Sequence, residues 1–125
     1  MNTNKLVNVM SQDLSYCEPK LKNSFHSESK KVLKELSRIL GIEKECKISS
    51  NKAGIACSGE ISLHGDSIYI VISQFFGGEE VLYRGCDSRQ NSVSTSARGH
   101  NQYCKITDLF TEHQLSKFKK LSRIN

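Results

Sequence analysis

The sequence predicts an α+β fold, with an N-terminal amphipathic helix, an antiparallel sheet of four to five strands and a C-terminal helix. Three patterns predict it: helical apolar spacing over 19–40, apolar–polar alternation over 59–84, and a capped helical pattern after residue 111. A chain of 125 residues suits one domain. We therefore expect a single α+β domain over 19–125, preceded by an extended or mobile arm over 1–18, which shows no periodicity.

The first helix has a signal at each end. Pro19 suits the first helical position, where an N–H would lack a partner, and Gly41 follows the last apolar residue as a C-terminal stop. The predicted inner face comprises Leu21, Phe25, Ser29, Val32, Leu33, Leu36, Ile39 and Leu40. The opposite face carries Lys30, Lys31, Lys34 and Arg38. Such a face is most often solvated, and nucleic-acid binding is the alternative.

The sheet begins with two short strand candidates, 46–48 and 55–57, and continues with a hairpin. Gly65-Asp66 is predicted as its two-residue loop, because glycine readily takes the positive φ that such a turn needs. This register pairs Leu63 with Ile68. One face then carries Ile61, Leu63, Ile68, Ile70 and Ile72, and the other carries Glu60, Ser62, His64, Ser67, Tyr69 and Val71. A slip by one residue would expose the isoleucines, so the faces are strongly specified.

The second hairpin turns around Gly77-Gly78, and two loop lengths fit it. A two-residue loop pairs Ile72 with Tyr83, whereas a three-residue loop moves Leu82 to the isoleucine face and Tyr83 to the other. An 18-residue polar connection over 85–102 follows, which is either a functional loop or a disordered insertion.

A short strand at 103–106 and a C-terminal helix complete the prediction. The helix starts at the capping sequence Thr111-Glu112-His113-Gln114, with Phe110 and Leu115 spaced as a hydrophobic staple.

Composition restricts the classes of function. The net charge of +5 favours an anionic partner. The five cysteines lack CxxC spacing, no two histidines are close in sequence, and the first 18 residues lack the apolar core of a secretory signal. We therefore expect a cytoplasmic protein without a membrane span, metal site or cofactor, and with no catalytic residues. A catalytic Cys–His pair has no support from spacing.

Phosphate binding is the chemistry that the sequence favours. Arginine offers a planar fork suited to phosphate, and a Ser/Thr/Gly-rich segment can place backbone N–H groups around an anion. An aromatic residue beside an exposed turn can stack on a base, and asparagine can bond a base edge or ribose. The candidate ligand-binding residues are Arg84, Arg89 and Arg98 for phosphate, Phe75 for stacking, and Asn91 and Asn101 for base or ribose.

The run SNKAGIACSGEISLH over 50–64, the segments 72–74 and 82–86, and the helix that ends before Gly41 resemble the Thoeris anti-defence proteins of the nucleotide-sponge type. The resemblance covers most of residues 25–110. It implies a phage-encoded protein that binds and sequesters a bacterial cyclic ADP-ribose signal, without degrading it, in pockets of a homodimer or larger homo-oligomer. After the arginine that family has Asp-Tyr-Thr-Gly-Gly where this chain has QNSVS over 90–94, so the contacts of this loop depart from the family pattern.

The leading hypothesis is thus a non-enzymatic, nucleotide-sequestering protein in the cytoplasm of an infected bacterial host cell. Two alternatives remain. One is a small basic nucleic-acid-binding module that uses the lysine faces of the helices, although nucleic acid is not the expected partner. The other is a protein-interaction inhibitor of a host enzyme that binds through an exposed sheet edge.

Overall fold

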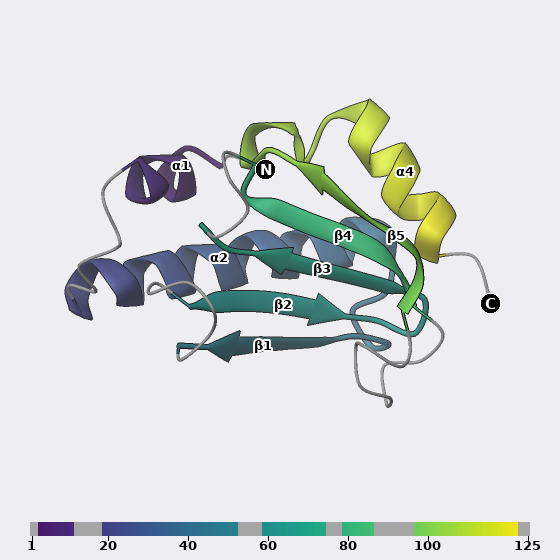
Figure 1. The fold of residues 1–125 in the computed structure, drawn as a ribbon, viewed down its shortest axis with the longest axis horizontal. Coiled ribbons are helices and arrows are strands. Elements are labelled where there is room, and N and C mark those ends of the chain that lie inside the picture. The colour runs from purple at the N-terminus through teal and green to yellow at the C-terminus, as the bar shows by residue number, and fades with distance from the viewer. Residues whose placement is uncertain (1–2, 12–18, 53–58, 75–78, 87–96, 123–125) are drawn as a thin grey trace.

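A computed structural model describes residues 3–11, 19–52, 59–74, 79–86 and 97–122 (Figure 1). Its elements in chain order are α1 (Asn4–Met10), α2 (Pro19–Leu40), β1 (Lys47–Asn51), β2 (Glu60–His64), β3 (Ile68–Ile72), β4 (Val81–Cys86), β5 (Ala97–Cys104), the 3-10 helix η2 (Ile106–Asp108) and α4 (Glu112–Ser122). The strands form one antiparallel sheet in the order β1-β2-β3-β4-β5. The predicted α+β class is confirmed.

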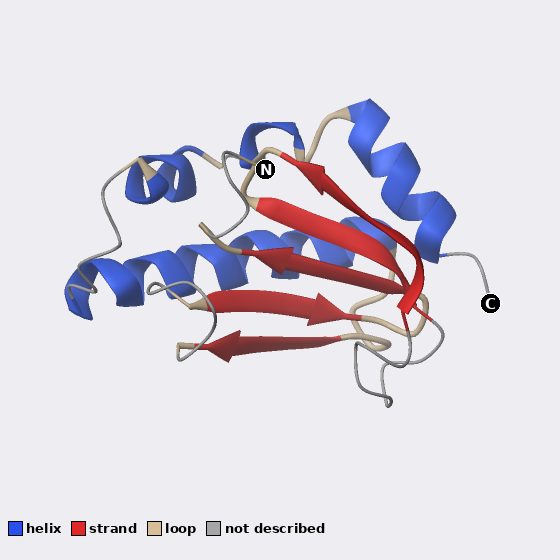
Figure 2. Cartoon of the chain, in the orientation of Figure 1, coloured by secondary structure: helices blue, strands red, loops and turns tan. Residues whose placement is uncertain are grey.

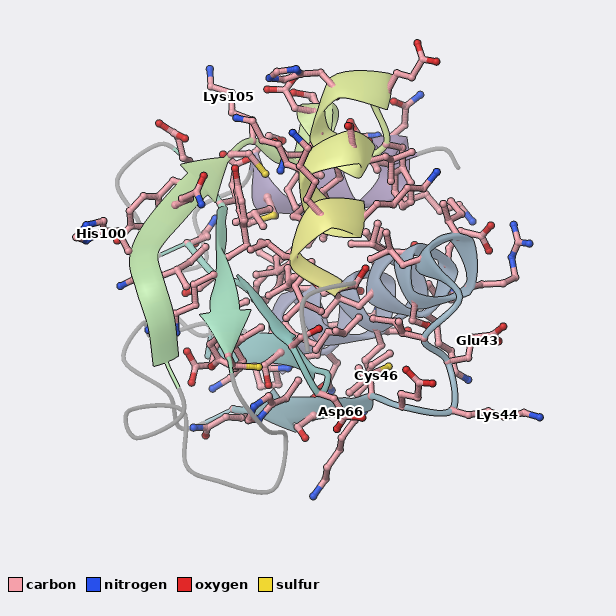
Figure 3. All side chains as sticks on the ribbon, turned by 90° about the vertical axis from the view of Figure 1, so that its right-hand side faces the viewer. Glu43, Lys44, Cys46, Asp66, His100 and Lys105 are labelled. Atoms are coloured by element: carbon pink, nitrogen blue, oxygen red, sulfur yellow. The ribbon has the colours of Figure 1, made fainter. Side chains whose placement is uncertain are left out.

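The described helices cover one face of the sheet (Figures 2 and 3). Helix α2 contacts β1 and β2, and α4 contacts β3 and β4. The face beneath them is apolar and buried, as predicted, and it includes Ile61, Leu63, Ile68, Ile70, Ile72, Val81 and Tyr83. The opposite face, here called the open face, carries no helix among the described residues. Because the described helices cover only one face, the open face is the surface on which the sheet can present polar side chains.

Helix α2 has the predicted ends. It begins at Pro19, and Gly41 follows it with φ of 72°. The N–H of Gly41 donates to the carbonyl of Arg38 at 3.1 Å, and the N–H of Ile42 donates to that of Ser37 at 3.0 Å. This pair of bonds is the Schellman arrangement, which satisfies the last carbonyls of a helix.

One half of the capping box predicted for α4 is confirmed, and in the other half the backbone N–H of Thr111 donates to the carbonyl of Asp108 instead of to the side chain of Gln114. The Oγ1 atom of Thr111 accepts a hydrogen bond from the backbone N–H of Gln114 at 3.2 Å. Within the helix, Phe118 is fully buried and meets the ring of Tyr83 edge to face, with centroids 5.1 Å apart. This contact holds α4 against β4.

The expectation of an extended or mobile arm over 1–18 is wrong for residues 4–10, which form α1. Leu6 is 1% exposed and belongs to the same core cluster as Phe25 of α2. A helix of seven residues is unstable by itself, so burial of Leu6 must hold it in place. Because two turns contain too few apolar residues to show a period, the sequence pattern missed this tertiary contact.

The predicted loop of the β2–β3 hairpin is displaced by one residue. The N–H of Gly65 donates to the carbonyl of Ile68 at 2.8 Å, so the loop consists of residues 66–67, and Gly65 does not adopt a positive φ. Leu63 accordingly pairs with Ile70 instead of Ile68. The register therefore differs by two residues from the prediction, a shift that leaves the strand side chains on their predicted faces and moves Ser67 into the loop.

The β3–β4 pairing decides between the two faces proposed for Tyr83. Ile70 pairs with Tyr83 and Ile72 pairs with Val81, which places Tyr83 on the core face and Leu82 on the open face. The three-residue alternative is therefore wrong about these faces. The two-residue alternative is right about them but has a register two residues away, and Gly77-Gly78 lies outside the described residues.

Strand β5 starts earlier than expected. Residues 97–102 were predicted to belong to a polar connection, yet they pair with β4 as part of an eight-residue strand. The sequence pattern failed here because β5 is an edge strand, in which four successive residues, 100–103, are exposed and no apolar alternation is needed. Residues 85–86 of the same predicted connection belong to β4. Residues 87–96 and the predicted strand at 55–57 lie outside the described residues.

Candidate functional site

Four side chains form a row across the open face, one from each of four neighbouring strands: His64, Tyr69, Arg84 and Asn101. Strand pairing explains why the first three side chains are neighbours, because His64 lies directly opposite Tyr69 and Tyr69 lies directly opposite Arg84. Directly opposed side chains in an antiparallel sheet are close enough to interact. We call these four residues the cross-strand row.

The contacts along the row hold its arginine in a defined position. The ring of His64 meets the ring of Tyr69 edge to face, with centroids 5.3 Å apart. The guanidinium carbon of Arg84 lies 5.1 Å from the centroid of the same tyrosine, a cation–π contact. Its Nη1 atom donates to Oδ1 of Asn101 at 2.8 Å. The guanidinium is thus oriented by an aromatic face and an amide before any ligand arrives.

The β4–β5 register brings Asn101 to this position, because Tyr83 pairs with Gln102 and the next residues along the two strands are Arg84 and Asn101. An irregularity in the sheet follows at this point. The β4–β5 pairing passes from Tyr83–Gln102 directly to Gly85–Arg98, so three residues of β5 face one residue of β4. Such bulges bend a strand and redirect its side chains. Asn101 is one of the three residues, and its side chain reaches the arginine of the row.

The electrostatics of the row keep its tyrosine neutral. Burial raises the pKa of Tyr69 above its ordinary value of 10, and the Glu60 carboxylate raises it further, while Arg84 opposes both effects. The phenol therefore stays protonated around neutral pH. The guanidinium beside it remains the positive group that an anion would meet.

The structure brings together two of the six sequence-predicted ligand-binding residues, Arg84 and Asn101. Arg98 lies in β5, where its backbone pairs with Gly85. The other three lie outside the described residues; they are Phe75, Arg89 and Asn91.

The sequence interpretation missed His64 and Tyr69 as parts of the site. It assigned both to the polar face of the first hairpin, but its register placed His64 opposite Ser67, where there is no aromatic ring. A register two residues further along would have put the two rings side by side, as the structure does. The alternation of polar residues correctly placed both side chains on one face, but it could not give the register that sets them opposite each other.

Among the described residues no side-chain cluster suits a metal ion, and the two buried cysteines are poor nucleophiles. They contain no group of three or more His, Cys, Asp or Glu side chains that could hold a metal ion. Burial raises the pKa of the Cys104 thiol to about 12, so very little reactive thiolate forms near neutral pH. Cys86 is 1% exposed, and its thiol donates a weak hydrogen bond to the carbonyl of Gly65, with Sγ 3.3 Å from the oxygen.

A cleft of about 510 Å³ lies apart from the row, between α1, η2 and the ends of β3 and β4. Its lining includes two carboxylates, Glu79 and Glu80, and a single lysine, Lys105. Glu80 is partly engaged, because its Oε1 accepts the backbone N–H of Ile106 at 3.0 Å. The negative charge makes this cleft a poor phosphate site despite its size, so we take the cross-strand row as the candidate site.

No helix in the described part of the chain is long and apolar enough to cross a membrane. A scan against protein-family models and searches of curated proteins and of solved structures found no match.

Proposed function

We propose that this protein binds a cyclic ADP-ribose-type signalling nucleotide and sequesters it without degrading it. The observation that carries the proposal is the Arg84 guanidinium, which is held between the ring of Tyr69 and the amide of Asn101 on the open face of the sheet. A nucleotide of this type presents phosphates, riboses and a base. The row offers Arg84 and Asn101 as hydrogen-bonding partners, and Tyr103 on the same face of the sheet offers an aromatic surface for the base.

The fixed guanidinium provides two-pronged hydrogen bonding to phosphate oxygens. The amide of Asn101 can bond a ribose hydroxyl or a base edge. Tyr103, which is 46% exposed and pairs with Leu82 on the open face, adds aromatic surface on which a base can stack. Because the arginine is already ordered, binding loses less side-chain entropy than it would with a mobile one. Sequestration requires binding alone, so the proposal needs no catalytic group or cofactor.

The biological setting of the proposal rests on the family resemblance. It comprises a phage-encoded immune-evasion protein, active in the cytoplasm of the infected bacterial host cell and assembled as a homodimer or larger homo-oligomer. In this proposal Arg89 and Arg98 add phosphate contacts to the site, while Phe75 adds stacking and Asn91 adds a base or ribose contact.

Calorimetric titration with the isomers of cyclic ADP-ribose tests the proposal. We expect one isomer to bind at micromolar or lower concentration and to be recovered chemically unchanged after the complex is denatured by heat. Recovery of a degraded nucleotide would show an enzyme, and failure of every isomer to bind at micromolar concentration would refute the proposal. Native mass spectrometry of the same samples would report the oligomeric state and the stoichiometry.

Nucleic-acid binding through α2 is less favoured, because two of its cations have carboxylate partners on the same helix. Lys31 lies 3.1 Å from a carboxylate oxygen of Glu28, and Arg38 bonds Glu35. Measuring affinity against salt concentration separates the two functions. A nucleic-acid complex loses affinity steeply as salt rises, because many phosphates are neutralised, whereas a single small nucleotide has few.

A further inference from the structure

A second surface, distinct from the cross-strand row, lies where α2 passes the edge strand β1. Two hollows of about 340 and 260 Å³ follow this boundary and share the lining residues Lys34 and Ile48, and we treat the two together as one groove. We call it the β1–α2 groove. The lining residues that bear on its chemistry are Lys30, Lys31, Lys34, Glu43, Cys46 and Ile48.

The groove has an apolar floor and a cationic rim. Ile48 and Cys46 are partly buried and pack against the core, and Figure 3 shows Cys46 between β1 and α2. The rim consists of exposed lysines of α2, namely Lys30, Lys31 and Lys34. Lys31 is paired with Glu28 and Glu43 lines one end of the groove, so the attraction for an anion rests on Lys30 and Lys34. An occupant must therefore combine an apolar side chain with negative charge.

The backbone of β1 adds hydrogen-bonding capacity to the groove. Among the described strands β1 pairs only with β2, so its other side is a sheet edge. The bond from Gly65 to Ile68 sets the alternation of hydrogen-bonded pairs through the sheet. Following that alternation across the β2 register, the N–H and C=O groups of Ile48 and Ser50 point away from β2. These groups match the backbone of an added strand.

Charge selects the kind of strand that can be added. If a second copy of this chain paired its own β1 there in antiparallel fashion, its α2 would lie alongside this one, and the lysine rims would face each other. Like charges at such a distance oppose self-pairing. An acidic segment is attracted at the same positions, since its carboxylates lie near the lysines while one of its apolar residues covers Ile48.

We propose that the β1–α2 groove binds an extended acidic segment of another protein, which joins the sheet as a strand beside β1. Strand addition of this kind takes affinity from backbone hydrogen bonds and specificity from alternate side chains. Side chains on one face of the added strand meet the floor and the lysine rim. This surface is independent of the proposed nucleotide site, so either proposal can fail alone.

Fluorescence anisotropy with a short fluorescein-labelled peptide of alternating Glu and Val tests the proposal at low ionic strength. We expect saturable binding that the K30E/K34E variant weakens by roughly tenfold or more, because two attractive charges become repulsive. The matched control is K119E/K120E, which changes the net charge equally at exposed positions of α4 and should alter affinity by less than about twofold. Circular dichroism of both variants verifies that the fold is retained.

A second peptide separates strand addition from charge attraction alone. N-methylation of alternate residues removes backbone donors from the peptide and leaves its charge unchanged, so we expect it to lose most of the binding. Equal affinity of the two peptides, equal weakening by both charge-reversal pairs, or no binding of the first peptide would overturn the proposal. Tighter binding of an oligothymidine to the same lysines, or dimerisation of the chain that K30E/K34E alters, would also overturn it.

Discussion

Replacement of Arg84 by alanine should remove the interaction on which nucleotide binding depends. The side chain is partly buried, lies 5.1 Å from the ring centroid of Tyr69 and bonds Asn101 at 2.8 Å. A hydrogen bond to a charged group contributes about 1.5–3 kcal/mol. Loss of one such bond to a phosphate corresponds to roughly 10- to 150-fold weaker binding. Calorimetric titration with the best-binding cyclic ADP-ribose isomer measures this factor directly.

Two further variants separate geometry from charge. Arg84→Lys keeps the positive charge but loses the planar fork, so we expect an affinity between those of the wild type and of Arg84→Ala. Arg38→Ala removes the same charge from the exposed face of α2, where it bonds Glu35, and should leave affinity within about twofold of wild type. Urea unfolding of each variant confirms that the comparison is made between folded proteins.

A double-mutant cycle tests whether the row acts as a unit. Because Arg84 and Asn101 are bonded to each other, the effects of Arg84→Ala and Asn101→Ala on affinity should not add. Wild-type affinity of the Arg84→Ala variant would refute the placement of the phosphate at the cross-strand row. Strict additivity would refute the role of Asn101 in orienting the arginine.

Three other predictions concern the fold and the environment of the row. Leu6→Ala should lower the free energy of unfolding by about 2–4 kcal/mol in urea titrations, and a loss below about 0.5 kcal/mol would contradict the docking of α1. Gly59→Ala should cost more stability than Gly41→Ala, since both glycines have positive φ but only at Gly59 would the added methyl carbon collide with a backbone oxygen, that of Asn51; equal losses in thermal unfolding would contradict this. Arg84→Ala should raise the pKa of Tyr69 further, because the cation favours the phenolate, and ultraviolet titration at alkaline pH should show no such rise if the two groups are apart.

Helix α2 and the two faces of the sheet could be predicted because their signals are local. The ends of α2 depend on Pro19 and Gly41, and the backbone conformation that each residue favours does not depend on the rest of the chain. The isoleucine face of the first hairpin follows from alternation alone, since one face must be buried.

The register of that hairpin could not be predicted in the same way. Alternation repeats every two residues, so a shift by two leaves the same residues buried. A contact distant in sequence accompanies the observed register: the backbone N–H of Cys86 donates to the carbonyl of Ser67 at 3.0 Å, and its thiol lies against the carbonyl of Gly65. Strand β4 thereby holds a turn that the two strands of the hairpin do not specify alone.

For the candidate site too, some features follow from the sequence and others only from the tertiary structure. The sequence by itself determined that Arg84 and Asn101 are polar groups well suited to bind a nucleotide, because that depends on the chemistry of each side chain. Only the tertiary structure decided that they touch, and that His64 and Tyr69 complete the row. The physical reason is that this arrangement depends on the pairing register of four strands, which is set by contacts between segments far apart in the chain.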